Sequence, residues 1–480
     1  MNYPINPSDR RRISRRTLIA GAGGAVAAGM FAANGGIAGA RRPSVARAAV
    51  RAGRRPASGG PTLSQWYHGY GEAGVQEAVE GYAAAYEEAT VNVEWFPADY
   101  DSALASALLT DEGPDVFEIG NGPTIDMILS GQVVPLDGVL GDAESDFNER
   151  LLSRLTYDGH LWAVPQIIDM YFLVYRKSHL ADAGIEPPTT MDELIAAAAA
   201  LTSDDRKGLF LGNDGGVGPL GGMALWSAGA DYLTEDGQFG FDNDAVYASF
   251  AKLRELYESD SLLLGAPADW SAPDALISEL TSMQLTGLWT FPQLTEAFGD
   301  DFDAMPWPAL DASTGSASVP IGAFSSAVSA RSVDVDAAKA FVKWLWVDQT
   351  DLQNDFATSY GFHIPARNSL ADAADVLQDG AAATALQLYQ EYAFTQIPVL
   401  WTPAADTAYA DARTRIIAEG ADPAEEIAKV KEIVEAELER IGAGASGSSA
   451  PASSEPTSTD ISTDSTAGAT AESSAPATTG

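Results

Sequence analysis

Short apolar runs alternate with helical patterns between residues 61 and 442. The run "TLSQWYHGY" predicts a strand that passes into a loop. After it, apolar residues recur at Val75, Val79, Tyr82 and Tyr86, which are four, three and four positions apart. This spacing places them on one face of a helix. Two further strand patterns, "TVNVEWF" and "PDVFEIG", flank the helical pattern "YDSALASALL".

This alternation of strands and helices indicates a parallel sheet with helices on both faces. Ligands bind such sheets beyond the carboxyl ends of the strands. Two corners follow predicted strands in this half of the chain, at residues 66–72 and 120–123. We therefore expect both corners to lie at the edge of the sheet where a ligand binds.

The second half of the chain repeats the alternation after a long predicted strand, residues 167–175. A helix begins after "PPTT", where Thr190 and Glu193 have the spacing of a capping box. Strand patterns return at "SMQLTGLWTF", "DFDAMPWPAL" and "SVPIGAFSSAVSA", and the rest is mainly helical. A chain that leaves one lobe and returns to it must cross between lobes more than once. The order of elements therefore predicts a two-lobed clamp with a hinge.

Residues 1–60 have the layout of an export signal. They hold eleven arginines and one acid, Asp9, and Arg15 and Arg16 precede a weakly apolar run that leads to small residues. This layout is typical of a cleaved signal peptide, and the paired arginines indicate the twin-arginine type. An uncleaved membrane anchor is the alternative, but the run is too rich in Gly and Ala for a strong membrane span.

Residues 443–480 form a tail rich in Ser, Thr, Ala and Pro, with almost no large apolar residue. Such a composition cannot bury enough surface to offset the entropy cost of ordering. We expect this tail to be disordered, and its lack of an apolar terminal segment argues against a membrane anchor.

Composition excludes several kinds of site. The chain has no cysteine, which excludes disulfides, thiolate metal sites, cysteine nucleophiles and a lipid anchor on cysteine. Residues 61–480 hold 17 basic and 66 acidic residues, a formal charge of −49, so nucleic acid and anionic lipid surfaces are poor partners. The four histidines show no H-x-x-x-H spacing, and we predict no metal site.

The order of the motifs resembles that of the family 1 extracellular solute-binding proteins, the carbohydrate-binding subunits of ABC importers. Matching pieces include "GQVVPLDGVL", "FLVYRKSHLADAGIEPPTTMDELIAAA", "GLWTFPQL" and "GFHIPAR", and the likeness covers most of residues 62–442. The resemblance implies an α/β fold, a type II periplasmic-binding-protein-like clamp in which each lobe is a sheet flanked by helices. The expected first lobe comprises residues 61–168 and about 288–332, and the second comprises about 169–287 and 333–442.

The corner "WYHGYGE" holds residue types that suit a sugar ligand, which the resemblance implies. The apolar C–H face of a pyranose stacks on flat aromatic rings, and each hydroxyl left unpaired in a dry cleft costs about 1–3 kcal/mol. Tyr67, His68, Tyr70 and Glu72 are the candidates here, although Glu72 has the alternative of complementing a helix dipole. Trp66 lies within the apolar strand and is expected in the core.

Further candidates lie at strand ends and in loops. Asn121 follows a strand and can bind a hydroxyl or cap a helix. Asp169 is a charge inside an apolar strand and needs a partner or a ligand. Trp289 matches the stacking tryptophan that the family carries after a G-x-W strand end. Trp226 is open between the core and the cleft. Asn213 and Asp214 lie in a glycine-rich loop that could face the ligand, and the candidates for the rim are Phe362, His363 and Trp401. Arg367 is expected in a structural ion pair.

Together these features predict an exported monomer that is not an enzyme. It would capture a mono- or oligosaccharide and deliver it to the permease of an ABC importer, without a cofactor. Two other classes stay open. An extracellular glycosidase also stacks sugars and uses two carboxylates about 5–9.5 Å apart. A binding protein for iron would need clustered Tyr, His and carboxylate ligands, and one for an amino acid would need an Arg–Asp pair.

Overall fold

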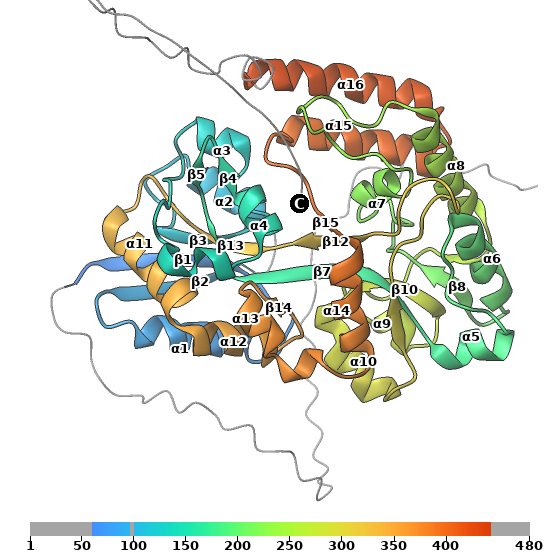
Figure 1. Cartoon of the computed structure of the whole chain (residues 1–480), viewed down its shortest axis with the longest axis horizontal. Coiled ribbons are helices and arrows are strands. Elements are labelled where there is room, and N and C mark those ends of the chain that lie inside the picture. Colours follow the sequence, from blue (N-terminus) through green and yellow to red (C-terminus); the bar gives the residue numbers. More distant parts are fainter. Residues whose placement is uncertain (1–59, 97–99, 443–480) are drawn as a thin grey trace, which may run out of the picture. The chain divides into compact units, whose positions relative to one another are not determined.

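The computed structural model describes residues 60–96 and 100–442. The predicted export signal, up to residue 59, and the predicted tail lie outside this part of the chain. Within it, two large sheets lie side by side in Figure 1. A short hairpin of β4 (Thr156–Tyr157) and β5 (His160–Leu161) forms a separate pair.

The first sheet has the strand order β2-β1-β3-β13-β6 in the described chain. β1, β2 and β3 run parallel, as predicted, and β13 is antiparallel to β3. We call this sheet and the helices packed on it the first lobe. Its strands are β1 (Thr62–His68), β2 (Thr90–Phe96), β3 (Val116–Gly120), β6 (Val164–Pro165) and β13 (Phe324–Val328).

The second sheet has the order β15-β12-β7-β10-β8-β9, with β11 and β14 also paired to β7. The long strand β7 has the predicted bounds and lies at its centre. We call this sheet and its helices the second lobe. Its strands are β7 (Ile167–Tyr175), β8 (Lys207–Phe210), β9 (Leu262–Leu263), β10 (Thr281–Gly287), β11 (Asp303–Met305), β12 (Val319–Gly322), β14 (Ile364–Pro365) and β15 (Ala393–Thr395).

Helices cover both sheets because each helix buries one apolar stripe. The predicted stripe Val75, Val79, Tyr82 and Tyr86 is buried in the first lobe. The helices with side chains in first-lobe cores are α1 (Val75–Ala85), α2 (Tyr100–Ala107), α3 (Ile125–Leu129), α4 (Glu149–Leu155), α11 (Val335–Lys343) and α12 (Thr350–Thr358).

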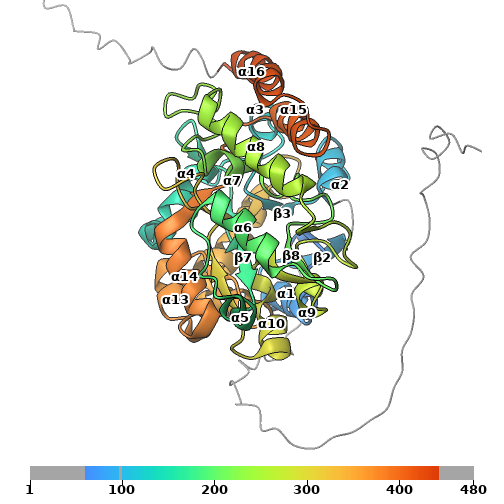
Figure 2. The ribbon, with the colours of Figure 1, turned by 90° about the vertical axis from the view of Figure 1, so that its right-hand side faces the viewer.

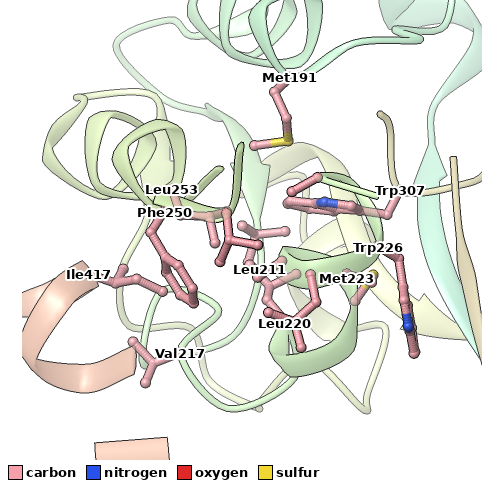
Figure 3. Close-up of a cluster of buried hydrophobic side chains, with 14 of the residues drawn as sticks. Met191, Leu211, Val217, Leu220, Met223, Trp226, Phe250, Leu253, Trp307 and Ile417 are labelled. Carbon is pink, nitrogen blue, oxygen red and sulfur yellow. The ribbon is translucent and has the colours of Figure 1, made fainter. Parts of the chain in front are cut away.

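The second lobe has a larger set of helices, several of which face the viewer in Figure 2. They are α5 (Lys177–Ala183), α6 (Met191–Leu201), α7 (Gly221–Trp226), α8 (Asp244–Glu258), α9 (Asp274–Ile277), α10 (Phe291–Phe298), α14 (Gly380–Tyr392), α15 (Pro403–Arg413) and α16 (Pro423–Arg440). The predicted capping box begins α6: Thr190 Oγ1 accepts from Glu193 N, and Glu193 Oε2 accepts from Thr190 N. Part of the core, with Trp226, Trp307 and Phe250, appears in Figure 3.

The described chain crosses between the lobes three times. β6 ends in the first sheet at Pro165 and β7 begins in the second at Ile167, while β12 and β13 are separated by Ala323 alone. The third crossing joins α12 of the first lobe to β14 (Figure 1). These connections confirm the predicted α/β fold of two lobes, and in such clamps they are the segments that absorb closure.

The lobe boundaries differ from the predicted ones. α10 and β11 belong to the second lobe, because Phe291 is in its core and β11 pairs with β7. α11 and α12 belong to the first, because Phe341 and Phe356 are buried there. The crossings lie at residue 323 and between residues 358 and 364, positions that a strand pattern alone does not mark.

The lobes also meet away from the crossings. Arg440, at the end of α16, forms an ion pair with Asp126 of α3, with 2.8 Å between Nη2 and Oδ1. Ile125, beside Asp126, is fully buried against the core of the second lobe. Within residues 60–96 and 100–442, no helix has the length and apolar character needed to cross a membrane.

Candidate functional site

A cavity of about 380 Å³ opens between the two lobes. Gly120 and Asn121, at the end of β3, line it from the first lobe, as the predicted corner requires. The crossing segment 322–324, two residues of β7 and loops of the second lobe complete the lining. The complete lining is Gly120, Asn121, Asp169, Tyr171, Gly218, Pro219, Trp270, Trp289, Gly322, Ala323, Phe324 and Gln396.

Three half-buried aromatic rings of the second lobe make one wall of this cavity. The ring centroids of Tyr171 and Trp270 are 5.1 Å apart, and those of Trp270 and Trp289 are 6.0 Å apart. Trp289 is held in place by its Nε1, which donates to the Ser271 carbonyl over 2.8 Å. We call these three residues the aromatic wall. Flat rings with fixed orientations can receive the apolar face of a ligand.

The absence of a side chain at Gly287 makes room for the Trp289 ring. A Cβ atom at residue 287 would lie 1.9 Å from Cζ3 of the Trp289 ring. The space beside Gly287 is therefore filled by the tryptophan that forms the wall.

Polar groups line the cavity beside the aromatic wall. Asn121 has a left-handed backbone (φ 57°), and its side chain packs against Gly322. A Cβ atom on residue 322 would lie 2.4 Å from Asn121 Oδ1. Gln396 Nε2 would be 3.0 Å from that same Cβ position. The side-chain amides of Asn121 and Gln396 have no hydrogen-bond partner among the described residues, so both are available to ligand hydroxyls.

Asp169, the one charged residue of the lining, is held by a buried histidine. His363 Nδ1 lies 2.5 Å from Asp169 Oδ1, and its Nε2 lies 3.3 Å from Glu72 Oε1. Burial alone would lower the pKa of His363, but the two carboxylates raise it to about 10. At neutral pH this cluster is therefore an imidazolium between two carboxylates.

The same cluster lowers the pKa of Glu72. Burial acts in the opposite direction, but the hydrogen bond and the charge of His363 outweigh it. Asp169 Oδ2 has no hydrogen-bond partner among the described residues, so one oxygen remains to accept from a ligand. Glu72 and His363 thus lie behind the cavity and position Asp169, which lines it.

A second buried cluster lies behind Phe324. Glu118 of β3 is bonded through Oε2 to His68 Nδ1, over 2.7 Å, and through Oε1 to the Tyr70 hydroxyl. Burial raises the pKa of Tyr70 well above its usual value, and the Glu118 charge adds to the shift. His68 stacks on Phe324 with 4.4 Å between ring centroids. His68 and Tyr70 therefore support a ring of the cavity lining and do not line it themselves.

Three predicted ligand residues lie in the core. Tyr67 is fully buried, and Trp226 and Trp401 are 2 % and 3 % exposed. Trp226 stacks on Phe394 at 4.9 Å and donates to Asp231, and Trp401 packs edge-on against Tyr232. Tyr67 was expected at the cleft and Trp401 at its rim, and the structure corrects both positions, whereas Trp226 was open between core and cleft. Both faces of these sheets are covered, so an aromatic residue at a strand end or on a helix has a core side to fill.

Only Tyr67 departs from its expected position, because Trp66 packs against a first-lobe core. Tyr67 shares a strand face with Leu63 in the first-lobe core, whereas Trp66 is half-buried on the other face beside Phe96. Phe362 is half-buried against the second-lobe core. Asp214 accepts from backbone N–H groups of its own loop, and Asn213 accepts from Ala266 N of a neighbouring loop, so neither lines this cavity. Arg367 forms the predicted ion pair with Asp146.

Sequence reasoning missed Tyr171, Trp270, Gln396 and Glu118. Two of them carried a usable signal. Tyr171 is two residues after Asp169 on β7 and so shares its face, and Glu118 is a charge inside an apolar strand, the argument applied to Asp169. Trp270 and Gln396 come from irregular segments, where no periodicity predicts direction. Among the described residues, no group of three His or carboxylate side chains could hold a metal ion.

The family model for bacterial extracellular solute-binding proteins matches residues 69–348. The diacetylchitobiose-binding protein DasA of Streptomyces coelicolor is 28 % identical over 254 residues, 50 % of this chain and 58 % of DasA. A lactose-binding protein of Rhizobium radiobacter is 24 % identical over 323 residues, 63 % of this chain and 74 % of that protein.

The fold has a close match among solved structures. The GacH receptor of Streptomyces glaucescens, solved unliganded and with acarbose, superimposes with a TM-score of 0.68 at 22 % identity. The match covers 79 % of this chain and 99 % of GacH. This likeness shows the fold, and the match of the family model to more than half of the chain shows the family. The chain therefore belongs to the bacterial extracellular solute-binding protein family.

Proposed function

We propose that this protein captures a saccharide in the cavity between its lobes and delivers it to the permease of an ABC importer. One observation carries the proposal: the aromatic wall and the polar side chains of Asn121, Asp169 and Gln396 line a single cavity. A stacking surface and hydrogen-bonding groups in one cavity match the two kinds of surface on a sugar ring. The relatives named for diacetylchitobiose and lactose, and the structure that holds acarbose, support the same ligand class.

The site favours binding over hydrolysis. A glycosidase needs two carboxylates on either side of the scissile bond. Asp169 is the only acid among the described residues that line this cavity, and Glu72 behind it is engaged by His363. We therefore infer a binding protein without catalytic activity, active as a monomer. Export through the twin-arginine segment is part of the proposal, and amino-terminal sequencing of secreted protein should show residues 1 to about 40–60 removed.

The experiment is calorimetric titration of the exported protein with diacetylchitobiose, lactose and acarbose, together with thermal unfolding. A ligand that binds only the folded state raises the melting temperature by mass action. At least one of these sugars should bind with a Kd in the micromolar range or below, about −8 kcal/mol. Release of reducing sugar from a glycan panel would instead indicate a glycosidase, and binding of ferric iron or an amino acid with no sugar binding would contradict the proposal.

A further inference from the structure

A second cavity of about 380 Å³ adjoins the first on the other side of Gln396, which lines both. One wall is α4, whose Leu155 packs in a first-lobe core, and the other is the loop around residues 231–237, whose Tyr232 packs in the second-lobe core. The segment 395–400 forms the base. A ligand that fills the first cavity can therefore extend past Gln396 into the second.

The α4 wall presents two arginines one helical turn apart. Arg150 Nη1 donates to the Ala393 carbonyl over 2.6 Å, and Arg154 Nε donates to the Ile397 carbonyl over 2.5 Å. Neither forms an ion pair within the described chain, although 66 acids follow residue 60. Arg154 Nη1 is buried and has no hydrogen-bond partner among the described residues. A buried donor without an acceptor is unfavourable, so this guanidinium is suited to bind an oxygen supplied from outside the chain.

The backbone that Arg154 contacts has an unusual conformation. Ile397 has a φ of 25°, in the region that a β-branched residue rarely adopts. Strained backbone of this kind persists where the surroundings hold it, and it is frequent at ligand sites. The bond from Arg154 Nε both stabilises this turn and fixes the orientation of the guanidinium plane.

The opposite wall presents acceptors. Asp231 Oδ1 is bound by Trp226 Nε1 at 3.0 Å and by Tyr232 N at 2.8 Å, and its second oxygen has no hydrogen-bond partner in the described structure. Glu235 is exposed and is also without one. The two acids would repel an anionic ligand, and the two arginines would repel a cationic one. An uncharged group with several hydroxyls, each both donor and acceptor, can bind to both walls at once.

The lining of the second cavity contains no aromatic residue: it consists of Arg150, Ser153, Arg154, Asp231, Leu233, Thr234, Glu235, Gly237, Thr395, Gln396, Pro398, Val399 and Leu400. A unit bound here is therefore recognised by its edge hydroxyls and not by ring stacking. We propose that this cavity is a second subsite for an uncharged sugar unit, so that the ligand has at least two sugar units. This inference rests on the proposed function and specifies the charge and the minimum size of the saccharide.

The test compares matched sugars on the exported protein. Calorimetry measures Kd for N-acetylglucosamine and diacetylchitobiose, and for galactose and lactose. In at least one pair the disaccharide should bind at least tenfold more tightly. Arg154→Gln should weaken binding of that disaccharide about tenfold, and binding of its monosaccharide less than threefold. Arg331→Gln is the matched control, because Arg331 lies away from both cavities and pairs with Asp111 on the surface.

Glu235→Gln, on the exposed opposite wall, is a second variant that leaves the Ile397 turn untouched, and it should weaken the disaccharide about threefold. Equal affinity for both members of each pair, or equal losses for both sugars in Arg154→Gln with no loss in Glu235→Gln, would overturn the second subsite. Tighter binding of digalacturonate than of either neutral disaccharide would overturn the uncharged class. If no sugar binds at all, the proposed function itself fails.

Discussion

The corner after β1 and the aromatic wall of the second lobe contain similar residues and use them differently. At the corner, His68, Tyr70 and Glu72 are bonded to Glu118 or His363, so their polar groups satisfy one another. At the wall, Tyr171, Trp270 and Trp289 are held by single hydrogen bonds or ring contacts and keep a side towards the cavity. Aromatic and acidic residues in one short stretch therefore do not by themselves identify ligand contacts.

The difference follows from charge and burial. A carboxylate inside a lobe must be paired, so Glu118 and Glu72 attract the polar ends of nearby His and Tyr side chains. The aromatic wall contains no such buried charge, so its rings need only to be held in position. The corner therefore supports the cavity from behind, and the aromatic wall provides the surface that a ligand can contact. Variants of His363 and Trp289 distinguish these two roles.

The largest expected effect is on stability, from His363→Ala. Removal of the imidazolium leaves Asp169 and Glu72 next to each other without a cation, and breaking a buried pair in this way costs about 3–5 kcal/mol. Urea unfolding at pH 7 measures the loss. The control is His160→Ala, because His160 and Asp137 form a pair that is about half exposed and is expected to contribute about 0–1 kcal/mol. Equal losses in the two variants would contradict the buried cluster.

The same cluster predicts a pH dependence. The folded state raises the pKa of His363 from its ordinary 6.5 to about 10. The folded protein therefore binds this proton more tightly than the unfolded chain. The resulting stabilisation is complete below pH 6.5 and is lost as the pH rises to about 10, by at most about 1.4 kcal/mol per pH unit.

Urea unfolding of wild type and His363→Ala at pH 6, 8 and 10 measures this dependence. The difference in unfolding free energy between the two proteins should narrow towards pH 10. A difference that stays constant over this range would show that His363 is not charged in the folded protein.

For the aromatic wall, Trp289→Ala should act mainly on ligand affinity. Loss of the ring should weaken sugar binding by about 2 kcal/mol, roughly 30-fold. The unfolding free energy should change by less than the roughly 3–5 kcal/mol typical of a buried Trp→Ala change. Trp226→Ala is the contrasting variant, with the stability loss of a core residue. If calorimetry shows that Trp289→Ala binds sugar with unchanged affinity, the sugar binds somewhere other than the aromatic wall.

The smallest effect is expected from residues outside both regions. Removal of residues 443–480 should change sugar affinity by less than tenfold, about 1.4 kcal/mol, because a segment of this composition has almost no large apolar residue with which to build a site. Calorimetry of the truncated and full-length proteins decides this. A larger loss would show that the tail contributes to the cavity.

The local elements of the fold could be read from the sequence. The spacing of Val75, Val79, Tyr82 and Tyr86, the capping box at Thr190 and the bounds of β7 depend only on residues near each other in the chain. The edge position of Asn121 followed from the alternation of strands and helices. Trp289 could be placed because it follows the end of a strand that the family resemblance also marks.

The pairing of side chains was decided by the tertiary structure. His363 and Asp169 are 194 residues apart, and they meet because β14 pairs with β7. Tyr67 and Trp66 lie on opposite faces of β1, and helices cover both faces: Tyr67 is fully buried in one first-lobe core, and Trp66 is partly buried against the other.

The sequence by itself determined the kind of protein: strand and helix periods are local, and the ordered motifs indicated a two-lobed clamp. Only the tertiary structure decided which residues face the ligand. Trp270 and Gln396 reach the cavity from irregular segments, and the two cavities adjoin at Gln396 because the segment after β15 runs between the lobes. Such contacts depend on the packing of whole elements, which no local pattern encodes.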